Sequence, residues 1–184
     1  MTDNLVQARP ARRRRAIHGM QAVATPGLRQ AFPPLTTRVA LACDAVAVNR
    51  LAQSALQGRP GSRSEPLVRP DPKSLSLDEI SAGRVILSEC GNLALGMAAI
   101  RPLGGDDWEI SAQYVAGQRW RSAIAFLLVA HCGDAARRHG GRALHVVGTS
   151  RATGFYLACD FRPIGQVQTP WGSANLLQRP LVAA

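Results

Sequence analysis

The stretch from Gly117 to Phe161 constrains the fold most strongly, because three elements of regular structure follow one another in it without a long break. Behind a turn at 117–122, apolar residues recur at spacings of three and four, which is typical of an amphipathic helix. The residues of this stripe are Ile124, Leu127, Leu128, His131, Cys132 and Ala135. Cationic side chains at 137–139 and the glycines at 140–141 suit the end of that helix. The short apolar run 143–147 then predicts a strand covered on both faces, and 151–159 predicts a second, shorter helix.

Flanking segments predict an α/β domain around this unit. We expect strands at 36–42, 84–89, 93–100, 108–115, 161–167 and 174–177, with glycine-containing turns at 90–92, 104–107 and 169–172. Asp44 is placed to cap a helix whose apolar side holds Val48, Leu51, Ala52 and Leu56. Ser74 or Ser76 opens a short helix that ends at Gly83. Between these two helices, residues 57–74 are rich in Gly, Pro, Arg and Ser, which indicates a long exposed loop.

Length and composition predict one domain with an N-terminal extension. The chain has 184 residues, of which 46% are hydrophobic, so residues 35–184 suffice for a real core. Residues 1–34 contain six arginines, Asp3 as their one acidic residue, four prolines and no amphipathic period, which predicts a disordered basic tail. The run Arg12–Arg15 has two interpretations, a phosphate-binding arm or a solvated leader, and we favour the solvated leader.

Several classes of protein are disfavoured. The four cysteines stand singly without a Cys-x-x-Cys pair, so we expect no metal site. No window approaches the roughly 18 to 20 apolar residues of a membrane-spanning helix. The N-terminal arginines are not followed by an apolar segment of the secretory type, so we expect a cytoplasmic protein. The three tryptophans are not spaced as a stacking series, and nucleic-acid binding is therefore disfavoured despite the formal charge of +10.

The order and spacing of motifs from 84 to 180 resemble the GCN5-related N-acetyltransferase (GNAT) superfamily. The segments concerned are Tyr114-Val115, Gln118-Arg119-Trp120-Arg121-Ser122-Ala123, Leu144-His145-Val146, Gly154-Phe155-Tyr156 and Phe161-Arg162-Pro163. The aromatic pair followed five residues later by Phe-Arg-Pro is the most specific part. The resemblance implies a mixed, mostly antiparallel central sheet with a parallel pair around the cofactor-binding helix, and helices on both faces.

The resemblance also implies the chemistry, which is direct transfer of an acyl group, here expected to be acetyl, from acetyl-CoA to an amine. The pyrophosphate would lie at the turn before the long helix, where backbone N–H groups and the helix dipole face an anion. The residues implied there are Gln118, Arg119, Trp120, Arg121, Ser122 and Ala123, with Thr149 at the end of the following strand. The family turn is Gln/Arg-x-x-Gly-x-Gly/Ala, and this chain keeps the first glycine in neither register. Ser122 could replace it with a hydroxyl, although a helix cap is the favoured interpretation.

Catalytic roles follow from the same resemblance. A backbone N–H near Tyr114 or Val115 would bind the thioester oxygen. Glu109 matches a carboxylate that acts as base through water, and the competing interpretation is an ordinary surface glutamate. Tyr156 matches the tyrosine that protonates the departing thiolate, and the competing interpretation is packing beside Phe155, which we expect in the core. His131 and His145 are interpreted as buried, hydrogen-bonded histidines.

Two functions from different classes remain after this reading. The first is a coenzyme A dependent N-acyltransferase acting on an amine of a small molecule or a protein, and the second is a catalytically silent GNAT-like domain that binds a ligand or partner. A nucleic-acid or anionic-surface binder is a weaker third. A homodimer is left open, and no membrane partner is expected.

Overall fold

The computed structural model describes residues 33–57, 66–68, 75–117, 121–170 and 172–181. The expected tail falls outside these ranges apart from residues 33 and 34, and so do most of the expected loop and turn residues 118–120. The side chains of residues 121, 122 and 150 are likewise outside the description.

A seven-stranded mixed sheet forms the centre of the domain, with the strand order β1-β2-β3-β4-β5-β7-β6. Its strands are β1 (Leu35–Val39), β2 (Val85–Cys90), β3 (Leu93–Gly104), β4 (Asp107–Val115), β5 (Ala143–Gly148), β6 (Arg162–Thr169) and β7 (Gly172–Pro180). All neighbouring strands pair antiparallel except β4 and β5, which are parallel. The expected meander, the parallel pair and the final hairpin are therefore confirmed.

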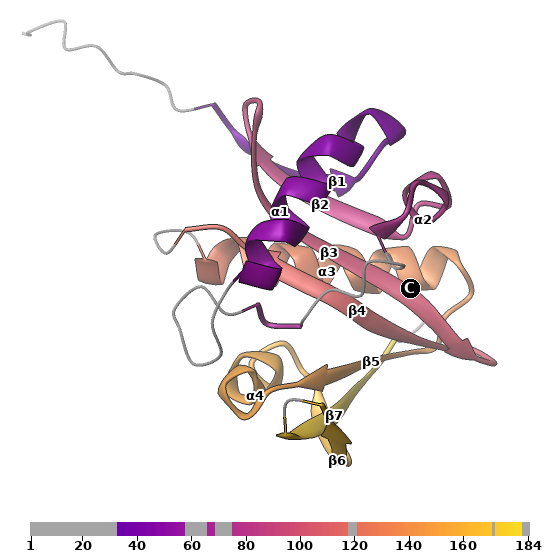
Figure 1. Ribbon diagram of the computed structural model, residues 1–184. Helices are drawn as coiled ribbons and strands as arrows, with labels where there is room; N and C mark the ends of the chain where they lie inside the picture. Colours follow the sequence, from indigo (N-terminus) through magenta and orange to yellow (C-terminus); the bar gives the residue numbers. More distant parts are fainter. Residues whose placement is uncertain (1–32, 58–65, 69–74, 118–120, 171, 182–184) are drawn as a thin grey trace, which may run out of the picture. The chain divides into compact units, whose positions relative to one another are not determined.

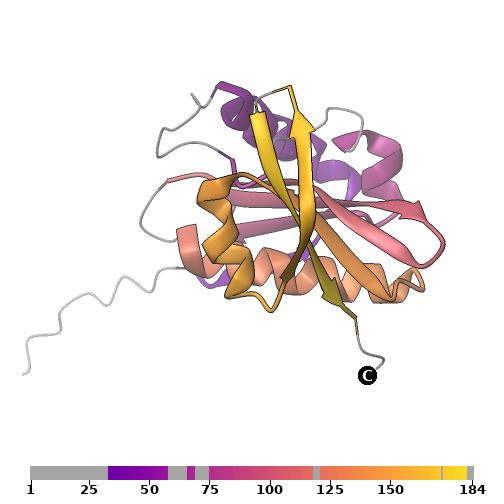
Figure 2. The ribbon, with the colours of Figure 1, turned by 90° about the horizontal axis from the view of Figure 1, so that it is seen from below.

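Helices cover both faces of this sheet (Figures 1 and 2). They are η1 (Ala42–Asp44), α1 (Ala45–Gln57), α2 (Leu77–Ser81), α3 (Arg121–Arg138) and α4 (Ser150–Leu157). Residues of α1 and α2 pack with Leu87, Met97 and Tyr114 of the sheet into one core. Residues of α3 and α4 pack with other sheet residues, including Ile100 and Val146, into a second core on the opposite face. The sheet is thus the middle of three layers, and the apolar sides of the helices are buried against its two faces.

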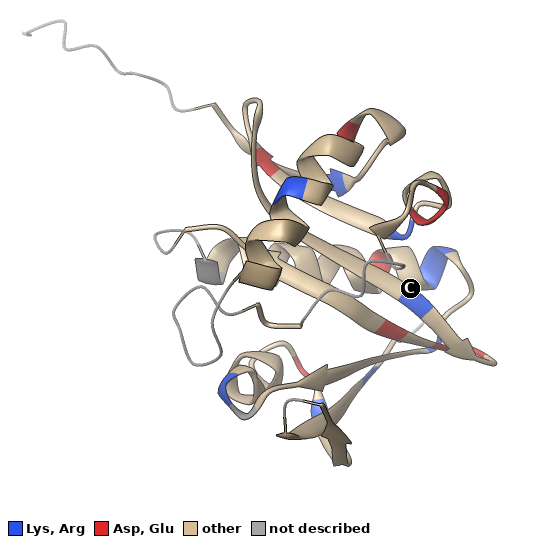
Figure 3. Ribbon diagram, in the orientation of Figure 1, with Lys and Arg blue, Asp and Glu red and all other residues tan. Residues whose placement is uncertain are grey.

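Helix boundaries confirm most of the sequence signals. The Ser76 hydroxyl accepts a hydrogen bond from the backbone N–H of Glu79, so Ser76 is the cap of α2. Gly140 adopts a φ of 81° just after α3, which is the left-handed conformation expected there. Figure 3 shows acidic and basic residues interspersed over the described elements. Most of the excess arginine lies in the N-terminal region and in 58–74, outside the described residues.

Three local expectations were wrong. Asp44 does not cap α1, because its carboxylate instead accepts from the Leu41 N–H and pairs with Arg38 at 2.6 Å. Leu56 and Leu127 were placed on buried stripes but are exposed, at 40% and 38%. In α1 the buried positions are Val48, Leu51 and Ala55, so the apolar stripe ends on the smaller residue.

Candidate functional site

The parallel strands β4 and β5 diverge, and this opening is the candidate site. Their register joins Asp107 to Ala143 at one end and Ile110 to Val146 at the other. β4 continues to Val115 and β5 to Gly148 without further pairing to each other. Figure 1 shows the two strands separating toward their C-terminal ends. In open sheets, ligands bind beyond the carboxyl ends of strands that separate in this way.

An irregularity in β4 coincides with the start of the opening. Ile100 of β3 pairs with Ile110 and the preceding Ala99 pairs with Ala112, so Ser111 is an extra residue in β4. Such a bulge bends its strand and increases the local twist, which accounts for the divergence from β5. Ser111 is only 6% exposed, and its hydroxyl has no hydrogen-bond partner among the described residues. A buried hydroxyl without a hydrogen-bond partner is uncommon in folded proteins.

Beyond the bulge, successive residues of β4 direct their backbone N–H and C=O groups alternately toward β3 and toward the opening. Ala116 donates its N–H to Leu95 of β3, so in an antiparallel ladder Tyr114 also faces β3 while Val115 faces the opposite edge. From the resemblance, the backbone N–H of either Tyr114 or Val115 was expected to bind the thioester oxygen. Of these two N–H groups, only that of Val115 points toward the opening, because that of Tyr114 faces β3.

Residue Gln113 faces the same edge, and its backbone groups are already paired. Leu67 and Val68 donate their N–H groups to the Gln113 carbonyl at 3.0 and 3.2 Å, and the Gln113 N–H donates to the Val68 carbonyl at 3.1 Å. Residues 67–68 therefore pair with β4 at the level where β5 has separated from it. Some of the backbone hydrogen-bonding groups that an entering ligand would meet on β4 are therefore already paired within the chain.

Tyr156 of α4 reaches the opening from the α3 face of the sheet. The residue is 0% exposed, and its hydroxyl donates a 2.7 Å hydrogen bond to the Oε1 atom of Gln113. The Gln113 Nε2 group in turn donates to the Ala125 carbonyl of α3 at 3.1 Å. These bonds fix the orientation of the amide, so the tyrosine is the donor of its hydrogen bond.

Burial raises the pKa of Tyr156 well above 10.0. The phenol therefore stays protonated over the physiological range, as a proton donor must. The expectation for its neighbour was wrong, since Phe155 is only partly buried and packs against Phe126 with ring centroids 5.1 Å apart. Helix α4 places Tyr156, rather than Phe155, toward the sheet, where the Tyr156 ring contacts Gly148 and Phe161.

Glu109 lies on β4 two residues before the bulge. It is 8% exposed and forms an ion pair with Arg101 of β3, whose Nη2 and Nε atoms lie 2.7 and 2.8 Å from its Oε2 atom. An ordinary surface glutamate does not fit this burial. One carboxylate oxygen is held by Arg101, and no described residue makes a hydrogen bond to the other, Oε1.

His145 lies directly opposite Glu109 on β5, so their side chains share one face of the sheet. Its Nε2 atom is 3.4 Å from Asp107 and 3.3 Å from the amide of Gln178. It is 8% exposed, which confirms the interpretation of a buried, hydrogen-bonded histidine. For His131 the expectation of burial was wrong, since the residue is only partly buried, but its Nδ1 atom does lie 2.9 Å from the Leu127 carbonyl. Glu109, Asp107 and His145 together form a polar cluster just before the opening.

Comparisons with known proteins agree with this geometry. No protein-family model matches the sequence, and no curated protein matches it. Solved structures do match, among them yncA from Salmonella typhimurium with acetyl-CoA, with a TM-score of 0.63, 17% identity, and coverage of 83% of this chain and 96% of that one. A GNAT-family protein from Desulfovibrio desulfuricans matches with a TM-score of 0.57, 15% identity, and coverage of 81% and 99%.

The chain has the GNAT fold. N-acetylglutamate synthase from Neisseria gonorrhoeae, complexed with coenzyme A and N-acetyl-glutamate, matches with a TM-score of 0.60 and 22% identity. This chain covers 36% of the synthase, and the match covers 82% of this chain. At identities of this level the likeness establishes the fold alone.

The turn before α3, for which the resemblance implies phosphate binding, is only partly described. Gln118, Arg119 and Trp120 lie outside the described residues, as do the side chains of Arg121 and Ser122. Helix α3 already includes Arg121, so Ser122 lies within its first turn rather than at the capping position. Ala123 is exposed in that turn. Thr149 precedes α4, and its carbonyl accepts hydrogen bonds from the N–H groups of Ala152 and Thr153.

Three residues of the candidate site were not singled out by sequence reasoning. Gln113 is an amide inside an otherwise apolar strand, which is a signal that was present in the sequence. Ser111 is brought to the site by a bulge in β4, and this bulge has no signature in the sequence. Arg101 is brought to Glu109 by the register of β3 against β4, which the sequence does not show.

Within the described residues, no group of three His, Cys, Asp or Glu side chains is arranged to hold a metal ion. In the same ranges, no helix has the length and apolarity needed to cross a bilayer.

Proposed function

We propose that the chain is a coenzyme A dependent N-acyltransferase that transfers acetyl from acetyl-CoA to an amine of a small molecule or protein. The observation that most supports this is the buried Tyr156 hydroxyl at the opening between β4 and β5, where Val115 also presents a backbone N–H. We further propose that residues 35–184 form the acyltransferase domain and that 1–34 lie outside it.

The residues at the opening fit a thioester donor. Its carbonyl oxygen gains negative charge in the transition state, and the Val115 N–H is suited to stabilise that charge. The buried Ser111 hydroxyl lacks a described partner and can accept or donate a hydrogen bond there. Arg119 and Arg121 add charge next to the first turn of α3, where the donor phosphates would bind.

The proposed reaction is a direct displacement. The acceptor amine forms a C–N bond with the thioester carbon while the C–S bond breaks and its electron pair leaves with sulfur. The amine proton passes through water to Glu109, whose Oε1 atom is not used by Arg101. Tyr156 supplies the proton that the thiolate takes up. For that step its hydroxyl must turn from Gln113 toward the sulfur atom, and a phenol hydroxyl is free to rotate about its C–O bond.

A second candidate is a catalytically silent GNAT-like domain that binds a ligand or partner. Two observations favour it. Val68 and Leu67 already occupy the Gln113 backbone groups at the opening. The first glycine of the phosphate turn is also replaced by a residue with a side chain. Both features reduce the space and the free hydrogen-bonding groups available to a donor.

Donor binding and turnover separate the two candidates. Acetyl-CoA binding is measured by calorimetry, and transfer is measured as free thiol released in the presence of a broad panel of amines. An acyltransferase binds the donor and releases thiol with at least one acceptor. The double variant Arg119→Ala/Arg121→Ala should weaken donor binding and reduce its salt dependence, while Arg142→Ala, at an exposed arginine away from this turn, should not. Donor binding without thiol release across the panel would favour the silent domain.

A further inference from the structure

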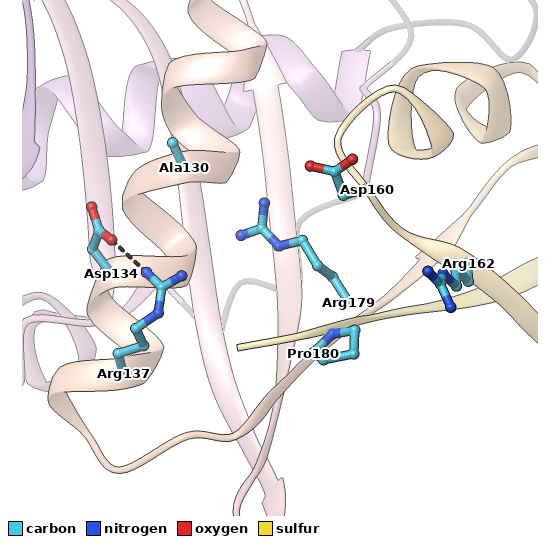
Figure 4. A pocket seen from close by; sticks show the side chains of 7 residues that line it. All are labelled: Ala130, Asp134, Arg137, Asp160, Arg162, Arg179 and Pro180. Atoms are coloured by element: carbon cyan, nitrogen blue, oxygen red, sulfur yellow. Dashed lines mark hydrogen bonds and ion pairs between the residues drawn. The ribbon is translucent and has the colours of Figure 1, made fainter. Parts of the chain in front are cut away.

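A groove on the α3 face, away from the opening, is lined by charged residues that neither candidate function uses. It has a volume of about 590 Å³ and lies between the C-terminal half of α3, the turn after α4, and strands β6 and β7 (Figure 4). The charged residues lining it are Asp134, Arg137, Asp160, Arg162 and Arg179. A volume of this size accommodates a small molecule.

Arg179 is the residue that makes the groove unusual. Its side chain extends from β7 toward α3, and its guanidinium lies against the Phe161 ring at 5.1 Å from the centroid (Figure 4). Its hydrogen bonds go to the backbone carbonyls of Cys159 and Val129, both at 3.4 Å. These bonds are long, and among the described residues Arg179 has no carboxylate within ion-pair distance. Burial lowers its pKa, since enclosure disfavours the charged form.

The Arg179 guanidinium packs closely against helix α3 at Gly133. A Cβ atom at Gly133 would come too close to the Arg179 Nη2 atom, so the absence of a side chain there leaves room for the guanidinium in its present position. A half-buried cation without an anionic partner costs free energy, which a bound anion would recover.

Other charges in the groove favour an anion over a cation. Arg137 and Asp134 pair with each other at 2.7 Å on α3 and largely cancel. Among the described residues that line the groove, Arg162 and Arg179 then face one remaining carboxylate, that of Asp160, so these residues carry a net positive charge. Asp160 adopts a φ of 65°, and its carboxylate points toward the Arg179 side of the groove without pairing (Figure 4).

We propose that this groove binds a small oxyanion, a carboxylate or a phosphate group, with the Arg179 guanidinium as its principal donor. The planar fork of an arginine matches the two oxygens of either group. Two of its five N–H donors make the long bonds to backbone carbonyls, and the other three have no hydrogen-bond partner among the described residues. The groove is distinct from the turn before α3, where the donor phosphates would bind. Ala130 in the wall of the groove lies nine residues along α3 from Arg121, or about 13 Å.

The test uses the full chain and follows thermal stabilisation by sodium phosphate and by sodium acetate, each against sodium chloride at equal ionic strength. A ligand that binds only the folded state raises the melting temperature with its concentration. Stabilisation by phosphate alone assigns a phosphate ligand, and stabilisation by acetate as well assigns a carboxylate-type site. The absence of stabilisation by both anions would overturn the proposal.

Variants locate the binding. Arg179→Met should weaken the anion about tenfold to hundredfold, as loss of a charged hydrogen-bonding partner does. Arg142→Met, at an exposed arginine, should leave the affinity unchanged. Because phosphate can also bind at the turn before α3, the loss caused by Arg179→Met is measured again in the Arg119→Ala/Arg121→Ala background, where it should persist. Equal affinities with and without Arg179 in that background would refute the assignment.

A variant of opposite sign keeps the test decisive if Arg179→Met does not fold. Asp160→Asn removes the negative charge in the groove, and asparagine tolerates a positive φ, so the backbone is preserved. Anion affinity should rise about threefold to tenfold, as expected for removing one nearby like charge at an effective dielectric constant near a protein surface. An unchanged or weaker affinity in Asp160→Asn would contradict the proposal independently of Arg179.

Discussion

Replacing Tyr156 by Phe removes one oxygen atom and leaves the aromatic ring in place. The Tyr156 hydroxyl has one hydrogen bond, to Gln113 Oε1 at 2.7 Å, and both residues are completely buried. The variant therefore leaves the Gln113 oxygen in the core without a donor. Its other amide group remains bonded to the Ala125 carbonyl, so the side chain cannot turn away without losing that bond as well.

The expected cost follows from this geometry. A buried acceptor left without a partner costs about 1–3 kcal/mol in the free energy of unfolding. In a chain of this size, 1 kcal/mol corresponds to a shift of about 2–4 °C in Tm, so Tyr156→Phe should melt about 2–12 °C lower. A tyrosine that only packs through its ring would give a much smaller change.

Urea unfolding followed by circular dichroism measures this cost, and Tyr114→Phe is the matched control. Tyr114 is also buried, at 6% exposed, but its hydroxyl has no hydrogen-bond partner in the described part of the chain. Its replacement should change the free energy of unfolding by less than about 0.5 kcal/mol.

A double-mutant cycle isolates the bond between the two side chains. Gln113→Met leaves the Tyr156 hydroxyl unpaired and should be destabilising alone, whereas the double variant removes both polar partners. Residues in one hydrogen-bond network couple by about 0.5–3 kcal/mol, so the double variant should be more stable than the sum of the single losses. Strict additivity would show that the hydrogen bond contributes nothing to stability.

Transfer rates then separate the structural and chemical roles. If Tyr156 is the proposed acid, Tyr156→Phe lowers the rate on the order of a hundredfold to ten-thousandfold, with donor affinity close to that of the wild type. Gln113→Met retains the phenol and should keep most of the rate at a temperature where it is folded. A wild-type rate in Tyr156→Phe would refute the acid role and leave packing and hydrogen bonding as its functions.

Three further outcomes are expected. Glu109→Gln should lower the transfer rate on the order of a hundredfold or more, whereas Glu89→Gln, at the other arginine-paired strand glutamate, should not, as measured by thiol release. The free energy of unfolding should fall above about pH 9, because burial raises the pKa of Cys132 from 9.0 to about 12 and that of Tyr156 well above 10.0. The unfolded chain then loses these protons first, and urea titrations from pH 7 to 10.5 should show the decline; a flat profile would contradict it. Deleting residues 1–19 should leave Tm nearly unchanged in a thermal melt, and loss of cooperative unfolding would show that this segment is structural.

The elements of the fold were largely predictable because their signals are local. The α3 stripe, the apolar β5 run and the glycine turns each specify one element through period or backbone conformation. Errors occurred where a partner far along the chain decides the outcome. Asp44 looked like a helix cap, but Arg38 and the Leu41 N–H bind its carboxylate instead.

The candidate site was less predictable for the same reason. The resemblance named Tyr156 and Glu109, but their surroundings depend on strand register. The partner of Glu109 is Arg101 because β3 pairs with β4 in that register, and the partner of Tyr156 is Gln113, 43 residues away. No period or spacing along the sequence contains this information.

The divergence of β4 from β5 also explains why residues 67–68 lie at the site. Beyond the last residue pair with β5, the N–H and C=O groups on that edge of β4 have no partner in β5. Buried backbone groups of this kind cost free energy unless they are hydrogen-bonded. Leu67 and Val68 supply three hydrogen bonds to Gln113. If the amide groups of a bound acyl donor paired with Gln113, they would replace these hydrogen bonds with equivalent ones. The net binding free energy from that pairing is therefore small. Under the proposed function, most of the donor affinity must then come from its phosphates at the start of α3, at the turn where the usual glycine is missing and Arg119 and Arg121 supply positive charge.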